Sequence, residues 1–249
     1  MPIEILNKNA KANIILISEH ASNYIPDEFN SLGLSDAQLE LHIAWDIGIA
    51  DVTRKLSEIL DAPAILARFS RLLIDANRAL DQDGLIPSHT DKHKIDGNIG
   101  LSQAQIANRI ERFHKPFHDG ANSLINARLK GDHAPLVLNM HSFTPQMNGF
   151  RRPWHSGLLW NKDDRIAKTL KERLDNRGFN VGDNEPYTGQ ELNYTMNTHG
   201  TRHGFPHVNI EIRQDEIDHA AGVEKWSTLL AEEIKAIRAL PEMSYIKHY

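Results

Sequence analysis

Two histidines, His20 and His141, each follow a short apolar run at the point where a buried strand would end. Residues 14–17 lead through Ser18 and Glu19 to His20, and residues 136–140 lead directly to His141. Ligands of open parallel sheets bind beyond the carboxyl ends of the strands, so both imidazoles are expected at one edge. Two imidazoles, one carboxylate and an open position form the usual catalytic zinc site. Either histidine alone could instead cap its strand by hydrogen bonds, but the pair favours a metal site.

A third metal ligand must be an oxygen or another histidine, because the chain contains no cysteine. Asp46 stands in an apolar stretch, residues 43–49, near the start of a predicted helix. A carboxylate in apolar surroundings is costly unless it is paired or bound to a metal. An aspartate favoured by the helix dipole explains the same position, so both interpretations stay open. Asp46 is therefore the candidate for the third ligand of one zinc ion bound by His20 and His141.

Glu211 lies within residues 208–213, Val-Asn-Ile-Glu-Ile-Arg, whose first five residues are predicted to form a strand. Side chains alternate along a strand, so Glu211 and Arg213 share one face. A carboxylate beside a zinc-bound water can accept its proton, which makes Glu211 the candidate general base. The alternative is a structural ion pair between Glu211 and Arg213.

Residues 75–78 read Asp-Ala-Asn-Arg after another predicted strand. The planar fork of Arg78 matches a carboxylate, and Asn77 could add an amide donor. Taken alone the segment is an ordinary turn. Beside the two histidines it becomes a candidate substrate clamp.

Strands and helices alternate along the chain, which predicts an α/β fold with a mostly parallel sheet and helices on both faces. Capping-box pairs, Ser35 with Gln38 and Ser102 with Gln105, are expected to start two helices. Residues 81–100 and 182–205 are expected to be loops, the first of them a functional lid. The predicted strands are 14–17, 64–69, 72–74, 136–140, 157–160 and 208–212, and the predicted helices are 35–60, 102–129, 163–176 and 223–238.

The composition limits the classes of protein that the chain can belong to. Its 249 residues, 40% of them hydrophobic, suffice for one core, and no linker divides them, so one domain over 1–249 is expected, with a loosely held tail at 240–249. The net charge is −5 and no long basic run occurs, which argues against nucleic-acid partners. The first 18 residues have neither a signal-peptide profile nor the length of a membrane span, so a cytoplasmic protein without membrane contact is expected.

These segments together resemble the N-formylglutamate amidohydrolase family, which is related to zinc carboxypeptidases. The resemblance runs from residues 18–22, Ser-Glu-His-Ala-Ser, through residues 42–48 to the final strand. Residues 75–78 are similar to the carboxypeptidase segment of the carboxylate clamp, residues 141–143 to that of a zinc ligand, and residues 210–213 to that of the general-base glutamate. The resemblance implies a zinc-carboxypeptidase-like fold.

One departure concerns the metal. Carboxypeptidases take two zinc ligands from a His-x-x-Glu motif, whereas this chain has His20-Ala-Ser-Asn23. The resemblance therefore implies that the carboxylate comes from elsewhere, with Asp46 as the choice, or that the site is weakened. Residues 184–189 and 197–200 also resemble the family, which makes Tyr187 and His199 candidates for substrate contact or oxyanion support. Hydrogen-bonded loops would explain both equally well.

The resulting hypothesis is a zinc-dependent amidohydrolase that removes a formyl or other small acyl group from an N-acyl amino acid such as N-formylglutamate. Glu211 would act on the zinc-bound water, and Arg78, Asn77 and Arg213 would face the small-molecule substrate. A carboxypeptidase-like enzyme or a deacylase of another N-acyl amino acid is one alternative. A metal-poor, non-catalytic amino-acid-binding protein is the other, since fold does not fix function.

Overall fold

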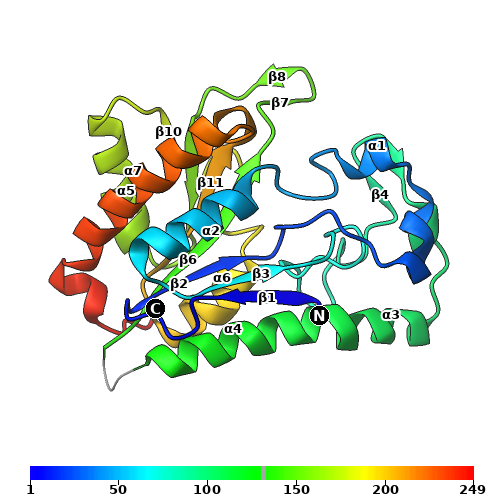
Figure 1. Ribbon diagram of the computed structural model, residues 1–249, viewed down its shortest axis with the longest axis horizontal. Coiled ribbons are helices and arrows are strands. Elements are labelled where there is room, and N and C mark those ends of the chain that lie inside the picture. Colours follow the sequence, from blue (N-terminus) through cyan, green and yellow to red (C-terminus); the bar gives the residue numbers. More distant parts are fainter. Residues whose placement is uncertain (130–132) are drawn as a thin grey trace.

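A seven-stranded sheet runs through the middle of the computed structural model, which describes residues 1–129 and 133–249 (Figure 1). Strands β2, β3, β6 and β11 run parallel to one another, whereas β1 and β9 run antiparallel to their neighbours β3 and β11. The carboxyl ends of four strands therefore meet at one edge of the sheet. The strand order is β1 (Ile3–Leu6), β3 (Ala64–Ala67), β2 (Ile14–Ser18), β6 (Leu136–Phe143), β11 (His207–Arg213), β9 (Ser156–Leu159) and β10 (Val181–Asp183).

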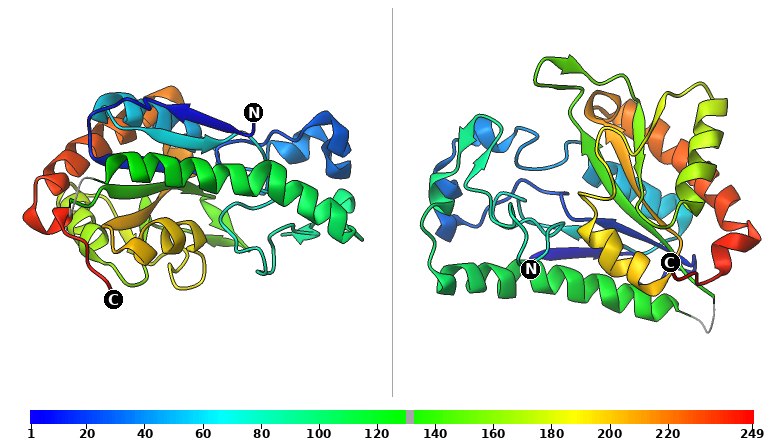
Figure 2. Two further views of the ribbon diagram at one scale, coloured as in Figure 1. Left: turned by 90° about the horizontal axis from the view of Figure 1, so that it is seen from below. Right: turned by 180° about the vertical axis from the view of Figure 1, so that it is seen from behind.

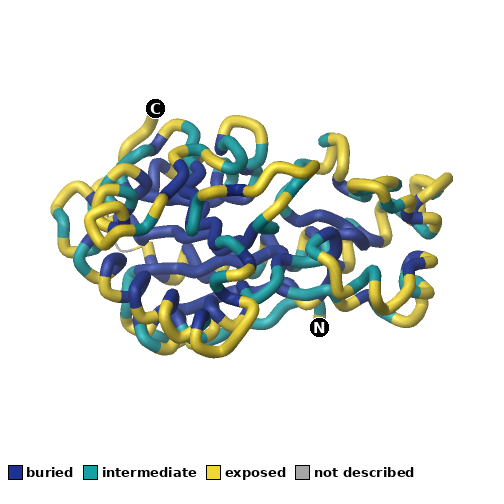
Figure 3. The backbone as a smooth tube through the Cα atoms, turned by 90° about the horizontal axis from the view of Figure 1, so that it is seen from above, coloured by how far each residue is buried: buried dark blue, intermediate teal, exposed yellow. Residues whose placement is uncertain are grey.

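Helices cover both faces of this sheet (Figures 1 and 2). Helices α2 (Ile49–Leu60), α5 (Arg165–Asn176) and α7 (Ala220–Arg238) pack on one face, and α4 (Lys115–Arg128) and α6 (Tyr194–His199) on the other. Alternate residues of β2 accordingly belong to two separate cores, Leu16 to the first and Ile15 and Ile17 to the second. Buried backbone fills the centre of the molecule (Figure 3). The α/β fold with a mostly parallel sheet is confirmed.

No helix in residues 1–129 or 133–249 combines the length and the apolar character needed to cross a membrane.

The predicted helix over residues 102–129 is continuous but contains one wider turn. Helix α3 (Gln103–Arg109) begins at a true capping box, in which Ser102 Oγ accepts from the backbone N–H of Gln105 and the Gln105 side chain accepts from Ser102 N–H. A π-helical turn, η3 (Ile110–His114), then leads into α4, where Pro116 offers no N–H to the ladder.

The predicted helix over residues 35–60 is wrong in its middle. Helix α1 (Asp36–Leu39) is short, and α2 begins only at Ile49. Gly48 between them has φ +80°, and a Cβ there would lie 2.3 Å from the carbonyl oxygen of Ile217, so only glycine fits. Asp46 therefore lies in a turn ahead of α2.

The predicted strand over residues 72–74 is also wrong. These residues are buried, but they form turns without a neighbouring strand. Side chains bind their carbonyl groups instead: Asn98 Nδ2 donates to the oxygen of Leu72 at 2.8 Å, and Arg109 Nη1 to that of Leu73 at 2.9 Å. The apolar residues predicted a buried strand, but side chains of other segments, instead of a neighbouring strand, bind their carbonyl groups.

Short elements fill the segments expected to be loops. A small lobe of α1, β4 and their neighbours projects beyond the sheet (Figure 1). The remaining short elements are η1 (Asp27–Gly33), β4 (His89–Thr90), β5 (His93–Lys94), η2 (Asp96–Asn98), β7 (Gln146–Met147), β8 (Phe150–Arg151), η4 (Thr201–His203), η5 (Gln214–Glu216) and η6 (Pro241–Ser244).

Residues 240–249, expected to be a loosely held tail, make hydrogen bonds to distant segments. Arg165 on α5 donates to the carbonyl oxygens of Glu242 and Tyr245 at 2.9 and 2.8 Å. The backbone N–H of Lys247 donates to Gly204 O at 2.8 Å.

Replacing Phe117 by alanine tests the core between α4 and the sheet. Phe117 is 0% exposed, whereas Phe150 at β8 is 59% exposed. We expect Phe117→Ala to lower the free energy of unfolding by about 3–5 kcal/mol, because transfer energy is lost and a cavity remains. Phe150→Ala, the matched control, should change it by less than about 0.5 kcal/mol. Equal urea midpoints for the two variants would contradict the packing described.

Candidate active site

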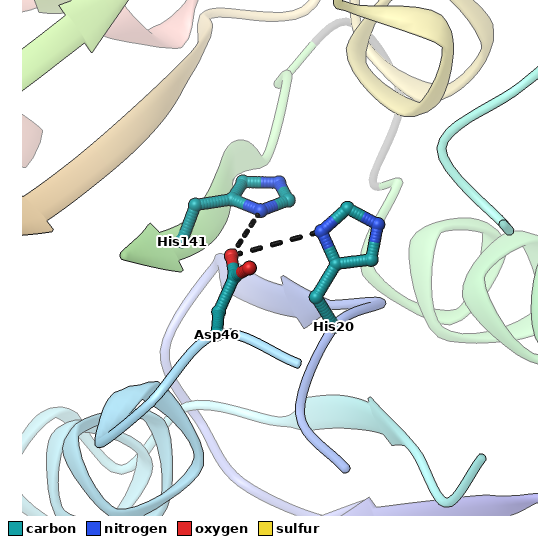
Figure 4. Close-up of side chains that lie close together, drawn as sticks. All are labelled: His20, Asp46 and His141. Carbon is teal, nitrogen blue, oxygen red and sulfur yellow. Dashed lines mark hydrogen bonds and ion pairs between the residues drawn. The ribbon is translucent and has the colours of Figure 1, made fainter. Parts of the chain in front are cut away.

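Three buried side chains converge at the carboxyl edge of the sheet (Figure 4). His20 follows β2, His141 belongs to β6, and Asp46 precedes α2. Asp46 Oδ2 lies 2.9 Å from His141 Nδ1 and 3.6 Å from His20 Nδ1. One ligand atom from each residue lies within 4.8 Å of the others. This His20–Asp46–His141 cluster could hold a metal ion.

The hydrogen bonds around the cluster fit a metal ion. His20 Nδ1 is buried and finds no hydrogen-bond partner in the described part of the chain, while Nε2 of the same ring donates to Asp75 Oδ1 at 2.7 Å. The second nitrogen of His141 faces Glu19 Oε1 at 3.5 Å. Metal-binding histidines generally direct their other nitrogen at a carboxylate or carbonyl, which fixes the ring and raises its basicity.

Burial and charge act against each other on the carboxylates of the cluster. Burial opposes the ionisation of Asp46, but His20 and His141 outweigh it and hold the pKa of Asp46 well below its usual range. Burial also raises the pKa of Glu19, but the nearby His141 outweighs burial and lowers the pKa of Glu19 to about 2. Both carboxylates therefore stay ionised at neutral pH.

The histidines respond in the opposite sense. Burial lowers the pKa of His141, but Glu19 and Asp46 raise it well above the usual range. Burial and Arg71 lower the pKa of His20, and its carboxylate neighbours raise it above 6.5 overall. Protons and a metal ion would therefore compete for the same imidazoles.

Glu211 lines the pocket that opens over the cluster. It stands opposite His141 in the register of β11 and β6, and its Oε2 lacks a hydrogen-bond partner among the described residues. Burial raises the pKa of Glu211 to about 7, Asp46 adds to that rise, and His141 acts against it. A carboxyl group that titrates near neutrality is suited to accept and return a proton.

Arg71 is a pocket residue that the sequence analysis missed. Its Nη2 donates to Asp75 Oδ2 at 3.0 Å, and its Nη1 lies 3.6 Å from Asp46 Oδ1. Burial lowers the pKa of Arg71, but the two carboxylates raise it overall, so the guanidinium is a fixed positive charge. Its place four residues before Asp75 could have identified it, but the wrong strand over residues 72–74 obscured that relation.

Asn77 and Arg78 line the same pocket, as the clamp hypothesis requires. Asn77 Oδ1 accepts from the backbone N–H of Thr195 at 3.0 Å, which leaves the amide NH₂ group as the donor available to a ligand. Gly84, in the predicted lid, also lines this pocket, and a Cβ there would lie 3.8 Å from Arg78 Nε.

Tyr187 reaches the pocket, whereas His199 and Arg213 do not line it. The Tyr187 hydroxyl accepts from Arg152 Nη2 at 3.0 Å, and burial together with Glu211 raises the pKa of the phenol. Arg213 donates to Asp215 Oδ1 at 2.6 Å, because β11 ends there and the next turn supplies a carboxylate. His199 stacks on His118, with 5.1 Å between the ring centroids. The structure thus places these two residues outside the pocket lining, and their expected substrate contacts stay predictions.

Asn23, the residue at the motif's carboxylate position, lies elsewhere. Its amide donates to Leu39 O and Glu40 Oε1, both at 3.1 Å. Asp46 occupies the place beside the histidines instead, from a different part of the chain.

Known proteins share both the sequence pattern and the fold. The family model of N-formylglutamate amidohydrolase matches residues 12–217. Among solved structures, a gene product of Agrobacterium tumefaciens is 32% identical, with 95% of this chain and 94% of that chain covered and a TM-score of 0.91. The N-formylglutamate amidohydrolase from Ralstonia eutropha JMP134 is 20% identical, with 97% and 98% covered and a TM-score of 0.73. No curated protein matches the chain. The resemblance inferred from the sequence is confirmed.

Zn²⁺ titration of the purified protein tests the cluster. Asp46→Asn removes the charged ligand between the imidazoles, so Zn²⁺ affinity should fall by about 100-fold or more. Loss of a residue that only hydrogen-bonds to a metal ligand typically costs about 10- to 100-fold. Asn23→Ala, the matched control at the motif position, should keep the affinity of the unmodified protein. A calorimetric titration in which Asn23→Ala loses the metal and Asp46→Asn keeps it would reverse the ligand assignment.

The raised histidine pKa values predict how Zn²⁺ affinity depends on pH. The pKa values of His20 and His141 lie above the ordinary value of 6.5, so the imidazoles carry protons even near neutral pH. A metal ion must displace these protons in order to bind. Apparent affinity should therefore fall by about tenfold or more as the pH is lowered from about 8.5 to about 6.5, measured by competition with a chelator. An affinity that stays flat down to the lower pH would show that neither imidazole is protonated there.

Proposed function

Since the chain belongs to the N-formylglutamate amidohydrolase family, we propose that it hydrolyses the amide bond of an N-acyl amino acid, with N-formyl-L-glutamate as the substrate tested first. The observation that carries this proposal is the buried Glu211 carboxyl, with a pKa of about 7, beside the His20–Asp46–His141 cluster. The same pocket holds the cations Arg71 and Arg78. It thus combines a proton acceptor, a metal cluster and carboxylate-binding groups.

One Zn²⁺ ion is the proposed cofactor, held by His20, Asp46 and His141. Imidazole nitrogen and carboxylate oxygen are typical zinc donors, and three protein ligands with an open position characterise catalytic zinc. When bound, the ion supplies a Lewis acid and lowers the pKa of a coordinated water to about 7.

Glu211 is the proposed proton carrier. As a carboxylate it accepts the proton of the attacking water, and as a carboxylic acid it returns that proton to the leaving nitrogen. A pKa of about 7 leaves both forms populated at neutral pH, which suits both half-steps.

The remaining pocket residues bind and orient the small-molecule substrate. Arg78 takes a substrate carboxylate with its guanidinium fork, and the Asn77 NH₂ group donates beside it. Arg71 places its positive charge where negative charge develops on the attacked carbonyl oxygen. The Tyr187 hydroxyl, whose pKa is raised further above neutrality by burial, can also donate into the pocket.

A deformylation assay of Glu211→Gln tests this function. The amide keeps the size of the side chain but cannot accept a proton, so kcat with N-formyl-L-glutamate should fall by about 100-fold or more. Bound zinc, measured by elemental analysis, should be unchanged. Glu191→Gln, an exposed change of the same type in the segment that carries Tyr187, is the control and should keep full turnover. A Glu211→Gln enzyme that retains both zinc and rate would remove Glu211 from this role.

A further inference from the structure

Three histidines outside the pocket lining form a second buried group, the histidine brace, consisting of His114, His118 and His199. All three are buried, at 3%, 8% and 0% exposure. Their ring centroids are 4.5 Å apart for His114 and His118 and 5.1 Å apart for His118 and His199. Burial lowers the pKa of His118 to about 3 and that of His199 to about 4, so both rings are neutral.

The brace makes direct hydrogen bonds to the clamp segment. His114 Nε2 lies 2.9 Å from the carbonyl oxygen of Arg78, and His118 Nε2 lies 2.9 Å from that of Ala76. A carbonyl oxygen can only accept, so each ring must donate from Nε2. The two histidines are four residues apart, at the end of the π-helical turn and in the helix after it, and therefore face the same segment.

The brace is itself supported from behind. His118 Nδ1 lies 2.8 Å from His199 Nε2, and His199 Nδ1 lies 3.1 Å from the atom assigned as Asn122 Oδ1. A neutral His118 that donates from Nε2 must accept at Nδ1, so His199 donates to it from Nε2. The Nδ1 atom of a neutral His199 must then accept, which requires the NH₂ group of the Asn122 amide to face it. Both ring nitrogens of His118 and both of His199 thus have hydrogen-bond partners, which fix the orientation of the two rings.

Asn77 lies between the two braced carbonyl groups. Its own side-chain oxygen accepts from Thr195, one helical turn before His199 on α6. The backbone on both sides of Asn77 and its side-chain oxygen are thus all fixed from outside the pocket.

We propose that His114 and His118 are positioning residues, which hold the Asn77–Arg78 segment in the geometry that binds a substrate carboxylate. This inference rests on the proposed function, because it takes that segment to be the carboxylate clamp. Turns between secondary-structure elements are mobile unless their polar groups are tied down. A misplacement of about 1 Å in a positioning group can cost about 100-fold in rate. A side chain without a donor at position 118 would leave the carbonyl of Ala76 buried and unpaired.

Variants at position 118 separate donation from packing. His118→Met fills similar space without a donor, whereas His118→Gln can place an amide N–H near the position of Nε2. His207→Met is the matched control, since His207 is also buried and donates to a backbone carbonyl, that of Phe205 at 2.7 Å, at the start of β11.

The substrates are N-formyl-L-glutamate and its two mono-amides, in which one carboxylate or the other is neutralised. N-formyl-L-glutamate and one mono-amide keep the carboxylate that the clamp binds. For these two substrates His118→Met should raise KM and lower kcat/KM by about tenfold. For the other mono-amide, which lacks that carboxylate, both constants should stay unchanged. His118→Gln should recover most of the loss, and His207→Met should show none. An equal loss with all three substrates, or no loss with any, would overturn the proposal.

Failure of the proposed function is recognised separately. If the unmodified protein hydrolyses none of the three substrates, the amidohydrolase assignment fails, and binding of L-glutamate by calorimetry replaces turnover. His118→Met must then weaken glutamate binding relative to His207→Met. Equal glutamate binding by the two variants, or no binding by the unmodified protein, would overturn the proposed positioning role of His114 and His118.

Discussion

A buried carboxylate held between two imidazoles is the constraint around which the site is organised. Asp46 is 4% exposed, and an ionised carboxylate in such a place is tolerable only with partners. It accepts hydrogen bonds from the backbone N–H of Ser142 at 3.1 Å and from His141, and its own backbone N–H donates to His20 O at 2.9 Å. The turn that delivers it depends on Gly48, where any side chain would collide with the chain near Ile217. Removing one partner would leave the others buried without compensation.

The same charge balance separates the roles of the pocket carboxyl groups. Asp46 and Asp75 in the pocket lining each face at least one imidazole or guanidinium, and their pKa values are lowered despite burial. Glu19, which is buried outside the lining beside His141, responds in the same way. Glu211 has no ion-pair partner in the described part of the chain, and burial dominates its pKa. Carboxyl groups within one pocket are thus divided into permanent anions and one that exchanges protons near neutrality. Such a division marks acid–base chemistry in enzymes of many folds.

The sequence predicted best the features that depend on local pattern. Apolar runs that end in a histidine revealed β2 and β6, and the rule that parallel strands share a carboxyl edge placed His20 and His141 together. It failed where partners come from distant segments. The strand expected at residues 72–74 was a turn, because Asn98 and Arg109 capture its carbonyl groups. No spacing rule could have shown this.

The site residues that escaped the sequence analysis share that property. Arg71 is recognisable as a site residue only once Asp46 and Asp75 lie beside it. His118 is recognisable only once its helix packs against Ala76. A histidine in an amphipathic helix carries no signal of its acceptor, which lies 42 residues away in the sequence. The resemblance to a family helped with motifs along the chain, but it gave no sign that His199 would form a hydrogen bond with His118 outside the pocket lining.

Two kinds of element therefore supply the two halves of the site, with different mechanical demands. His20, His141 and Glu211 stand on or next to the central strands, whose ladder hydrogen bonds fix the backbone there, and the turn before α2 adds Asp46. The residues proposed to bind a carboxylate stand on a turn, which has no ladder and must be held by side chains. The long helix provides that support, because His114 and His118 are four residues apart on it and bind the carbonyl groups of Arg78 and Ala76. Precision at the proposed clamp thus depends on a helix whose own residues do not line the pocket.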